Sequence, residues 1–111
     1  MTTQQLLDAE QYISHCEIGY FTGPFSESAI RDDLQTRKAR DSYSMMGTPP
    51  HRTNFLSEKK QFYYKDFNEV EQYLGLILGM LQNTYPAHTL IPRCERCKNQ
   101  IVKLRNLVQN F

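Results

Sequence analysis

Three segments of the chain place apolar residues at alternating spacings of three and four, which is the pattern of an α-helix that buries one face. The first segment carries Leu6, Ala9, Ile13, Cys16 and Tyr20. The second carries Phe67, Val70, Leu74, Ile77 and Leu81. The third carries Leu90, Cys94, Cys97, Ile101, Leu104, Val108 and Phe111. The pattern predicts three amphipathic helices, with Gly23-Pro24 ending the first and Pro86 ending the second.

A further helix is predicted between the first two, beginning at Ser26. Its only apolar anchors are Ala29, Ile30 and Leu34. The polar run at 36–42 has little to bury, so this helix is expected to extend into solvent or to fray.

The start of the 67–81 helix has more than one interpretation. Asp66 and Glu69 match a capping box, which favours a first turn close to Asp66. The apolar pattern also continues back through Tyr63, so a start near Ser57 fits as well. The aromatic-rich segment at 60–65 could instead form a short β element.

The same helix carries apolar residues away from its buried face, at Leu76, Leu78 and Met80. A helix that is apolar on most of its circumference is expected to be central in the fold. Gly75 and Gly79 lie one turn apart, and each costs about 1 kcal/mol relative to alanine in a helix interior. We therefore expect another helix to pack closely against them, either within the bundle or from a second chain.

Residues 41–57 contain two adjacent prolines and no helical apolar period, which predicts one long irregular loop. Protein interfaces favour aromatic, methionine and arginine side chains, and prolines limit the entropy that a loop loses on binding. The alternative is that these side chains pack the loop onto the core. If the loop binds a partner protein, the residues expected to contact that partner are Tyr43, Met45, Met46, His51, Arg52 and Phe55.

The fold class that follows is all-α, a small bundle of three to five helices with one long loop. A chain of 111 residues has room for one core, so 1–111 is expected to be a single helical domain. The longest apolar run, 73–81, is about half of the roughly 20 residues that a membrane-spanning helix needs. The first residues lack the basic and apolar regions of a secretory signal. We therefore expect a cytoplasmic protein with no membrane segment.

The three cysteines raise the question of a metal site. Cys94 and Cys97 have the spacing of half a zinc site or of a redox pair, and His88 is the nearest further ligand candidate. Both cysteines also occupy buried positions of the last helix, so packing explains them without a metal. No phosphate-binding glycine loop or nucleophile elbow occurs. We expect no metal, no cofactor, no catalytic residue and no enzymatic activity.

Charge is balanced in total but uneven along the chain. Thirteen Lys and Arg residues against twelve Asp and Glu give a net charge of +1, which excludes a strongly basic nucleic-acid arm. Basic residues still cluster in 93–105 and in a second group. The alternative hypothesis is that these residues bind the phosphate groups of a nucleic acid. The second group is Arg37, Lys38, Arg40, Lys59 and Lys60.

The leading hypothesis is a non-enzymatic helical module that occupies the surface of another protein, as a regulator, inhibitor or assembly subunit. The partner is unidentified, and a homodimer is one form that it could take. A nucleic-acid-associated helical protein is the alternative. The salt dependence of affinity distinguishes the two, because phosphate contacts weaken steeply with salt.

Overall fold

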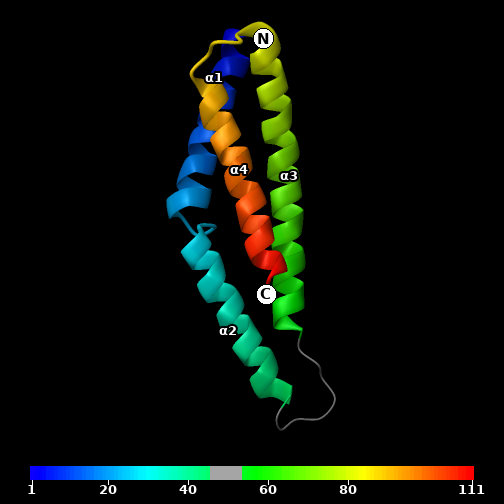
Figure 1. Ribbon diagram of the computed structural model, residues 1–111. Coiled ribbons are helices and arrows are strands. Elements are labelled where there is room, and N and C mark those ends of the chain that lie inside the picture. Colours follow the sequence, from blue (N-terminus) through cyan, green and yellow to red (C-terminus); the bar gives the residue numbers. More distant parts are fainter. Residues whose placement is uncertain (46–53) are drawn as a thin grey trace.

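The computed structural model describes residues 1–45 and 54–111, apart from the side chains at 43–45. These residues form a bundle of helices, which confirms the expected all-α fold (Figure 1). The elements are α1 (Thr3–Glu17), the π-helical turn η1 (Ile18–Thr22), α2 (Glu27–Met45), α3 (Phe55–Thr84) and α4 (Leu90–Gln109). None of the described helices is both long enough and apolar enough to cross a lipid bilayer.

The helices form an elongated body, with Cα extents of 60 × 21 × 20 Å. α1 and α2 follow one another along one side of the α3–α4 pair (Figure 1). α4 packs most extensively against α3 and also contacts α1, η1 and α2. The expected packing of the 67–81 helix against the last helix is confirmed, and α3 also contacts α2, reaches α1 through Tyr73 and reaches η1 through Asp66. The apolar residues that suggested a central α3 lie partly in solvent.

The buried positions predicted from the apolar pattern are confirmed in all three helices, except that Leu6 and Phe111 are only half-buried against the core. Ile13, Phe67, Leu74 and Ile101 have no exposed surface. The buried residues of each helix recur at spacings of three and four, as the helical period requires. One continuous core therefore runs along the bundle where these faces meet.

The break between α1 and α2 depends on Gly23. A Cβ atom at this position would lie 2.9 Å from the carbonyl oxygen of Ile18 and 3.1 Å from the Cα of Gly19. Only glycine lets the backbone approach itself this closely without a shift. The Tyr20 hydroxyl then ties the turn to α3 by donating to Asp66 Oδ2 at 2.6 Å.

α3 begins eleven residues before Asp66, at Phe55, so the predicted capping box at Asp66 and Glu69 is wrong. Asp66 lies inside the helix, and its carboxylate accepts the Tyr20 hydrogen bond. The short β element at 60–65 is also wrong, because these residues are helical. Within one turn of this helix, Tyr63 is buried, Tyr64 is half-buried and Phe62 is exposed.

A carboxylate of α2 caps the N-terminus of α3. Asp41 accepts hydrogen bonds from the backbone N–H groups of Phe55 at 2.8 Å and Leu56 at 3.0 Å. α2 and α3 take up both ends of the predicted loop at 41–57, since 41–45 and 55–57 are helical. The remaining residues of that loop, 46–53, lie outside the described part of the chain.

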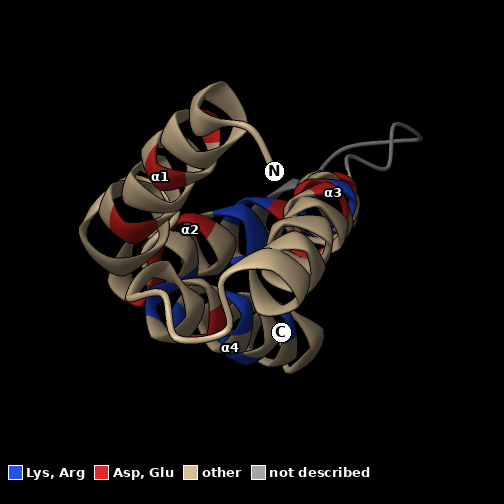
Figure 2. Cartoon of the chain, turned by 90° about the horizontal axis from the view of Figure 1, so that it is seen from above, with Lys and Arg blue, Asp and Glu red and all other residues tan. Residues whose placement is uncertain are grey.

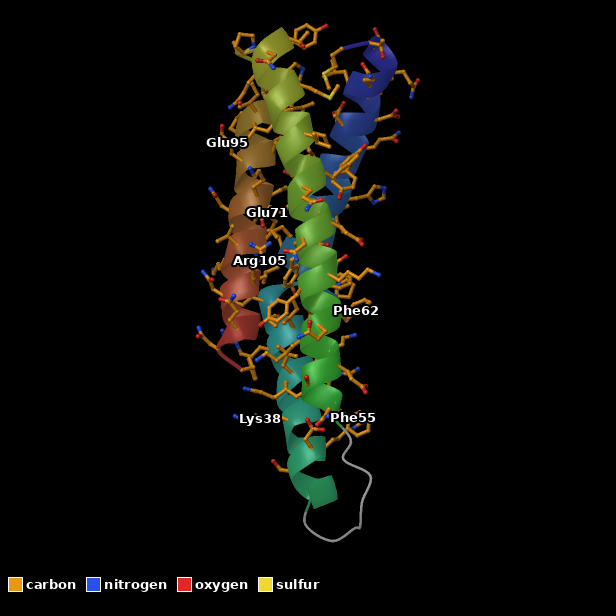
Figure 3. The ribbon with its side chains drawn as sticks, turned by 90° about the vertical axis from the view of Figure 1, so that its right-hand side faces the viewer. Lys38, Phe55, Phe62, Glu71, Glu95 and Arg105 are labelled. Carbon is orange, nitrogen blue, oxygen red and sulfur yellow. The ribbon has the colours of Figure 1, made fainter. Side chains whose placement is uncertain are left out.

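Ion pairs join α4 to each of the other helices. Arg93 pairs with Glu17 of α1 at 2.5 Å, and Lys103 pairs with Glu27 of α2 at 3.2 Å. Arg105 pairs with Glu71 of α3, and the two side chains lie together between these helices (Figure 3). These ion pairs help to orient α4 relative to the three helices that it packs against.

Candidate protein-binding surface

α3 has a second apolar surface that faces away from the core. Leu76 is 66% exposed and Met80 is 38% exposed. Because each residue turns the helix by about 100°, Leu76 points away from the buried position Leu74, and Met80 follows one turn later. Tyr73, at the edge of this side, packs on the ring of Tyr12 in α1, with ring centroids 4.3 Å apart. We define the outer face of α3 as Gly75, Leu76, Gly79 and Met80; Figure 3 looks toward this side of the helix.

The two glycines make a furrow beside the exposed leucine and methionine. No described heavy atom lies within 4 Å of a Cβ built at Gly79, and the one neighbour of such an atom at Gly75 is Lys98 Nζ at 3.9 Å. The prediction that another helix of this chain packs closely against them is therefore wrong. Leu76 and Met80 form a ridge with four-residue spacing, and Gly75 and Gly79 form a parallel furrow next to it.

The residues of the outer face carry no charge themselves, although the Lys98 ammonium of α4 borders it at Gly75. From Gln72 to Pro92 the sequence contains no Lys, Arg, Asp or Glu. Within the described part of the chain, no side chain from 72 to 84 forms a hydrogen bond or an ion pair with another described residue. In Figure 2, which looks along the bundle, the C-terminal end of α3 is nearest the viewer and has no Lys, Arg, Asp or Glu. A partner surface that fits here must itself be largely apolar.

The surface predicted at 41–57 lies mostly outside the described residues. Met46, His51 and Arg52 fall in 46–53, and the side chains of Tyr43 and Met45 are not described either. Phe55 is half-buried at the first turn of α3, where its N–H group binds Asp41. Partner binding by these residues stays a prediction.

Most basic residues of the nucleic-acid alternative already have partners within the chain. Arg37 pairs with Asp33 at 3.1 Å, and Lys59 Nζ lies 4.5 Å from the centre of the Phe62 ring. Lys38 and Arg40 are exposed and Lys60 is half-buried. In the 93–105 segment, an acid or an aromatic ring engages Arg93, Arg96, Lys103 and Arg105. These contacts occupy charges that phosphate groups would need.

The cysteines lie inside the bundle, as the apolar pattern of their helices predicts. Cys94 is 0% exposed and Cys97 is 2% exposed. The Cys94 thiol donates to the carbonyl oxygen of Leu74 at 3.3 Å. Burial raises the pKa of both thiols to about 11 and that of Cys16 to about 12, so all three are protonated at neutral pH.

The further ligand candidate, His88, has a structural role at the start of α4. Its Nδ1 atom accepts a hydrogen bond from the Leu90 N–H group at 3.0 Å. Within residues 1–45 and 54–111, no three His, Cys, Asp or Glu side chains are grouped so as to hold a metal ion. The structure therefore does not bring His88 together with Cys94 and Cys97 as a ligand set.

Buried tyrosines form the polar contacts between α3 and the first half of the chain. Tyr63 donates to Asp33 Oδ2 at 2.8 Å, and Tyr20 donates to Asp66. Burial, and then the hydrogen bond to the carboxylate, raises the pKa of each tyrosine above its usual value. These hydroxyls act as fixed donors that set the positions of α2 and η1 on α3.

The sequence pattern drew attention to the glycines of the outer face but not to the exposure of its apolar residues. The available signal was the placement of Leu76 and Met80 off the buried face, inside a stretch without charges. That signal fits a central helix equally well, and only the positions of the neighbouring helices separate the two interpretations. Comparisons of this chain with protein families, with curated proteins and with solved structures find no match.

Proposed function

We propose that this protein is a non-enzymatic helical module that binds another protein through the outer face of α3. The observation that carries the proposal is the exposure of Leu76 in an uncharged surface with open glycines beside it. Removing apolar surface from water is the main favourable term in protein association. A regulator, inhibitor or assembly subunit works in this way, by occupying a partner surface.

Two further observations support the proposal. The buried core residues of α3 lie on the other side of the helix from Leu76, and no described atom lies within 4 Å of a Cβ built at Gly79. Two glycines in a helix interior also lower helix stability by about 1 kcal/mol each. A close approach by a partner backbone would give them a role that no contact within the described chain provides. We place the protein in the cytoplasm, where its free cysteines would stay reduced.

The test compares two exposed aliphatic residues of equal exposure. Leu76→Gln alters the outer face of α3, and Ile18→Gln alters η1, where Ile18 is 65% exposed. Each variant and the unchanged protein serve as bait in host extract, and retained proteins are quantified by mass spectrometry. We expect Leu76→Gln to lose at least tenfold of the specific partner signal, while Ile18→Gln retains it. Equal retention by both variants would remove the outer face from the proposed function.

A further inference from the structure

The outer face of α3 has the shape of one half of a symmetric interface. Its ridge, Leu76 and Met80, and its furrow, Gly75 and Gly79, run side by side with the same four-residue spacing. A two-fold interface uses the same patch on both partners, so the patch must carry both a projection and the hollow that receives it. We propose that a second copy of this chain occupies this face, with the ridge of each α3 seated in the furrow of the other; this rests on the proposed function.

Helix geometry sets the expected crossing. Rows of side chains four residues apart are inclined to the helix axis, and packing such rows into each other gives an interaxial angle of about 50°. Glycines in the receiving row bring the two backbones close together. Because Gly79 meets open space, a partner helix can reach its backbone without displacing any described side chain.

The charge pattern selects an antiparallel pair. The half of α3 before Gln72 carries Lys65, Glu69 and Glu71, whereas residues 72–84 carry no charge. In a parallel pair that crosses at this angle, Glu69 and Glu71, just before the crossing, would approach the same residues of the other copy and bring like charges toward each other. In an antiparallel pair centred near Gly79, each charged half extends past the end of the partner helix. The uncharged segments then cover one another.

The area of the face suits a reversible dimer. The face is small, because it consists of Leu76 at 66% exposure, Met80 at 38% exposure and two glycines. Stable specific interfaces bury roughly 1,200–2,000 Å² in total, so contact through this face belongs to the small, transient class. Weak self-association, in the upper part of the concentration range tested below, is the expected consequence.

Substitution at Gly79 separates folding from association. A larger residue meets open space within the chain and has a better helix propensity than glycine, so Gly79→Leu should preserve or raise the melting temperature. In the dimer the same side chain fills the furrow that receives the partner ridge. Ala39→Leu is the matched control, because it adds a leucine at an exposed position of α2.

The experiment is sedimentation equilibrium of the full chain from about 1 μM to 1 mM, with the melting temperature of each variant measured at the lowest usable concentration. We expect the unchanged protein and Ala39→Leu to form dimers, and Gly79→Leu to associate at least tenfold more weakly without a lower melting temperature. If Gly79→Leu fails to fold, Leu76→Gln tests the ridge in its place. A monomer throughout this range, or dimerisation unaffected by either substitution, overturns the inference.

The two proposals fail in different ways. Suppose that the protein is monomeric in sedimentation and that Leu76→Gln still reduces the capture of a partner from host extract. This result would overturn the second-copy inference and leave the proposed function standing. If Leu76→Gln and Gly79→Leu change neither self-association nor the capture of a partner protein, both proposals are overturned.

Discussion

The two halves of α3 are held in different ways. Up to Glu71, side chains and backbone groups of the helix meet specific polar partners, including Asp33, Asp41 and Tyr20. From Gln72 to Thr84, apolar packing holds the helix, and within the described residues the one side chain from another helix that donates a hydrogen bond to it is Cys94, whose thiol binds the backbone carbonyl of Leu74. The first half is therefore oriented by directed contacts, and the second by shape alone.

This difference explains where an unpartnered surface can exist. Directed contacts in the first half require charged and hydroxyl-bearing residues, which interact favourably with water wherever they reach the surface. The second half carries no charged residue, so the part of it that lies outside the core between Gln72 and the polar residues at 82–84 is largely apolar. Phe62, which is 50% exposed in the first half, lies near the ammonium group of Lys59, whereas Leu76 has no such charged neighbour among the side chains that the structure describes.

The largest expected effect separates the inner and outer faces of the second half. Leu74→Ala removes a fully buried side chain and should lower the free energy of unfolding by about 2–5 kcal/mol. Leu76→Ala, two residues away and 66% exposed, should change it by less than about 0.5 kcal/mol. Urea unfolding followed by circular dichroism at low protein concentration measures both. Similar losses would show that Leu76 belongs to the core.

A matched pair of tyrosines compares the two halves directly. Tyr63→Phe removes the hydroxyl that donates to Asp33 and should lower the free energy of unfolding by about 1.5–3 kcal/mol. Tyr73→Phe removes a hydroxyl that has no hydrogen-bond partner among the described residues, so its loss should stay below about 0.5 kcal/mol. Equal losses in urea unfolding would contradict the view that directed contacts are confined to the first half.

The cap on α3 should have a smaller effect. Asp41→Ala leaves the N–H groups of Phe55 and Leu56 without their acceptor and should lower the free energy of unfolding by about 1 kcal/mol. Asp41→Asn keeps one acceptor oxygen, so its loss should be smaller. Asp32→Ala, at an exposed position of the same helix, is the control. Hydrogen exchange at Phe55 and Leu56 should speed up in Asp41→Ala and not in the control.

The buried thiols of α4, one of which contacts the second half of α3, should make the free energy of unfolding depend on pH, but only above neutral pH. Burial raises the pKa of Cys94 and Cys97 to about 11, whereas an unfolded thiol titrates near 8.5. Between these values the folded state binds more protons, so the free energy of unfolding is unaffected below about pH 8.5 and falls as pH rises toward 11. The double variant Cys94→Ala, Cys97→Ala should show a shallower fall. Identical pH profiles would mean that the thiols ionise equally in both states.

The apolar pattern by itself determined the helical fold and the inner faces of its helices. Ile13, Leu74 and Ile101 could be assigned to the core because burial of one helical face repeats every three or four residues, which is a local property. The cysteines of α4 follow the same period, and both are buried in the core as that period predicts. Such periodicity states which side of each helix is buried, but not what stands on the other side.

Tertiary structure alone decided the contacts between residues distant in sequence. Asp41 caps a helix that begins fourteen residues later. Asp66 accepts a hydrogen bond from the Tyr20 hydroxyl of η1, whereas the local sequence pattern predicted that Asp66 would cap the start of the helix. The exposure of Leu76 likewise depends on where α1 and α4 lie around α3. The same apolar residues and glycines are compatible with an enclosed helix or with an open face, because hydrophobicity is a property of a residue and burial is a property of its neighbours.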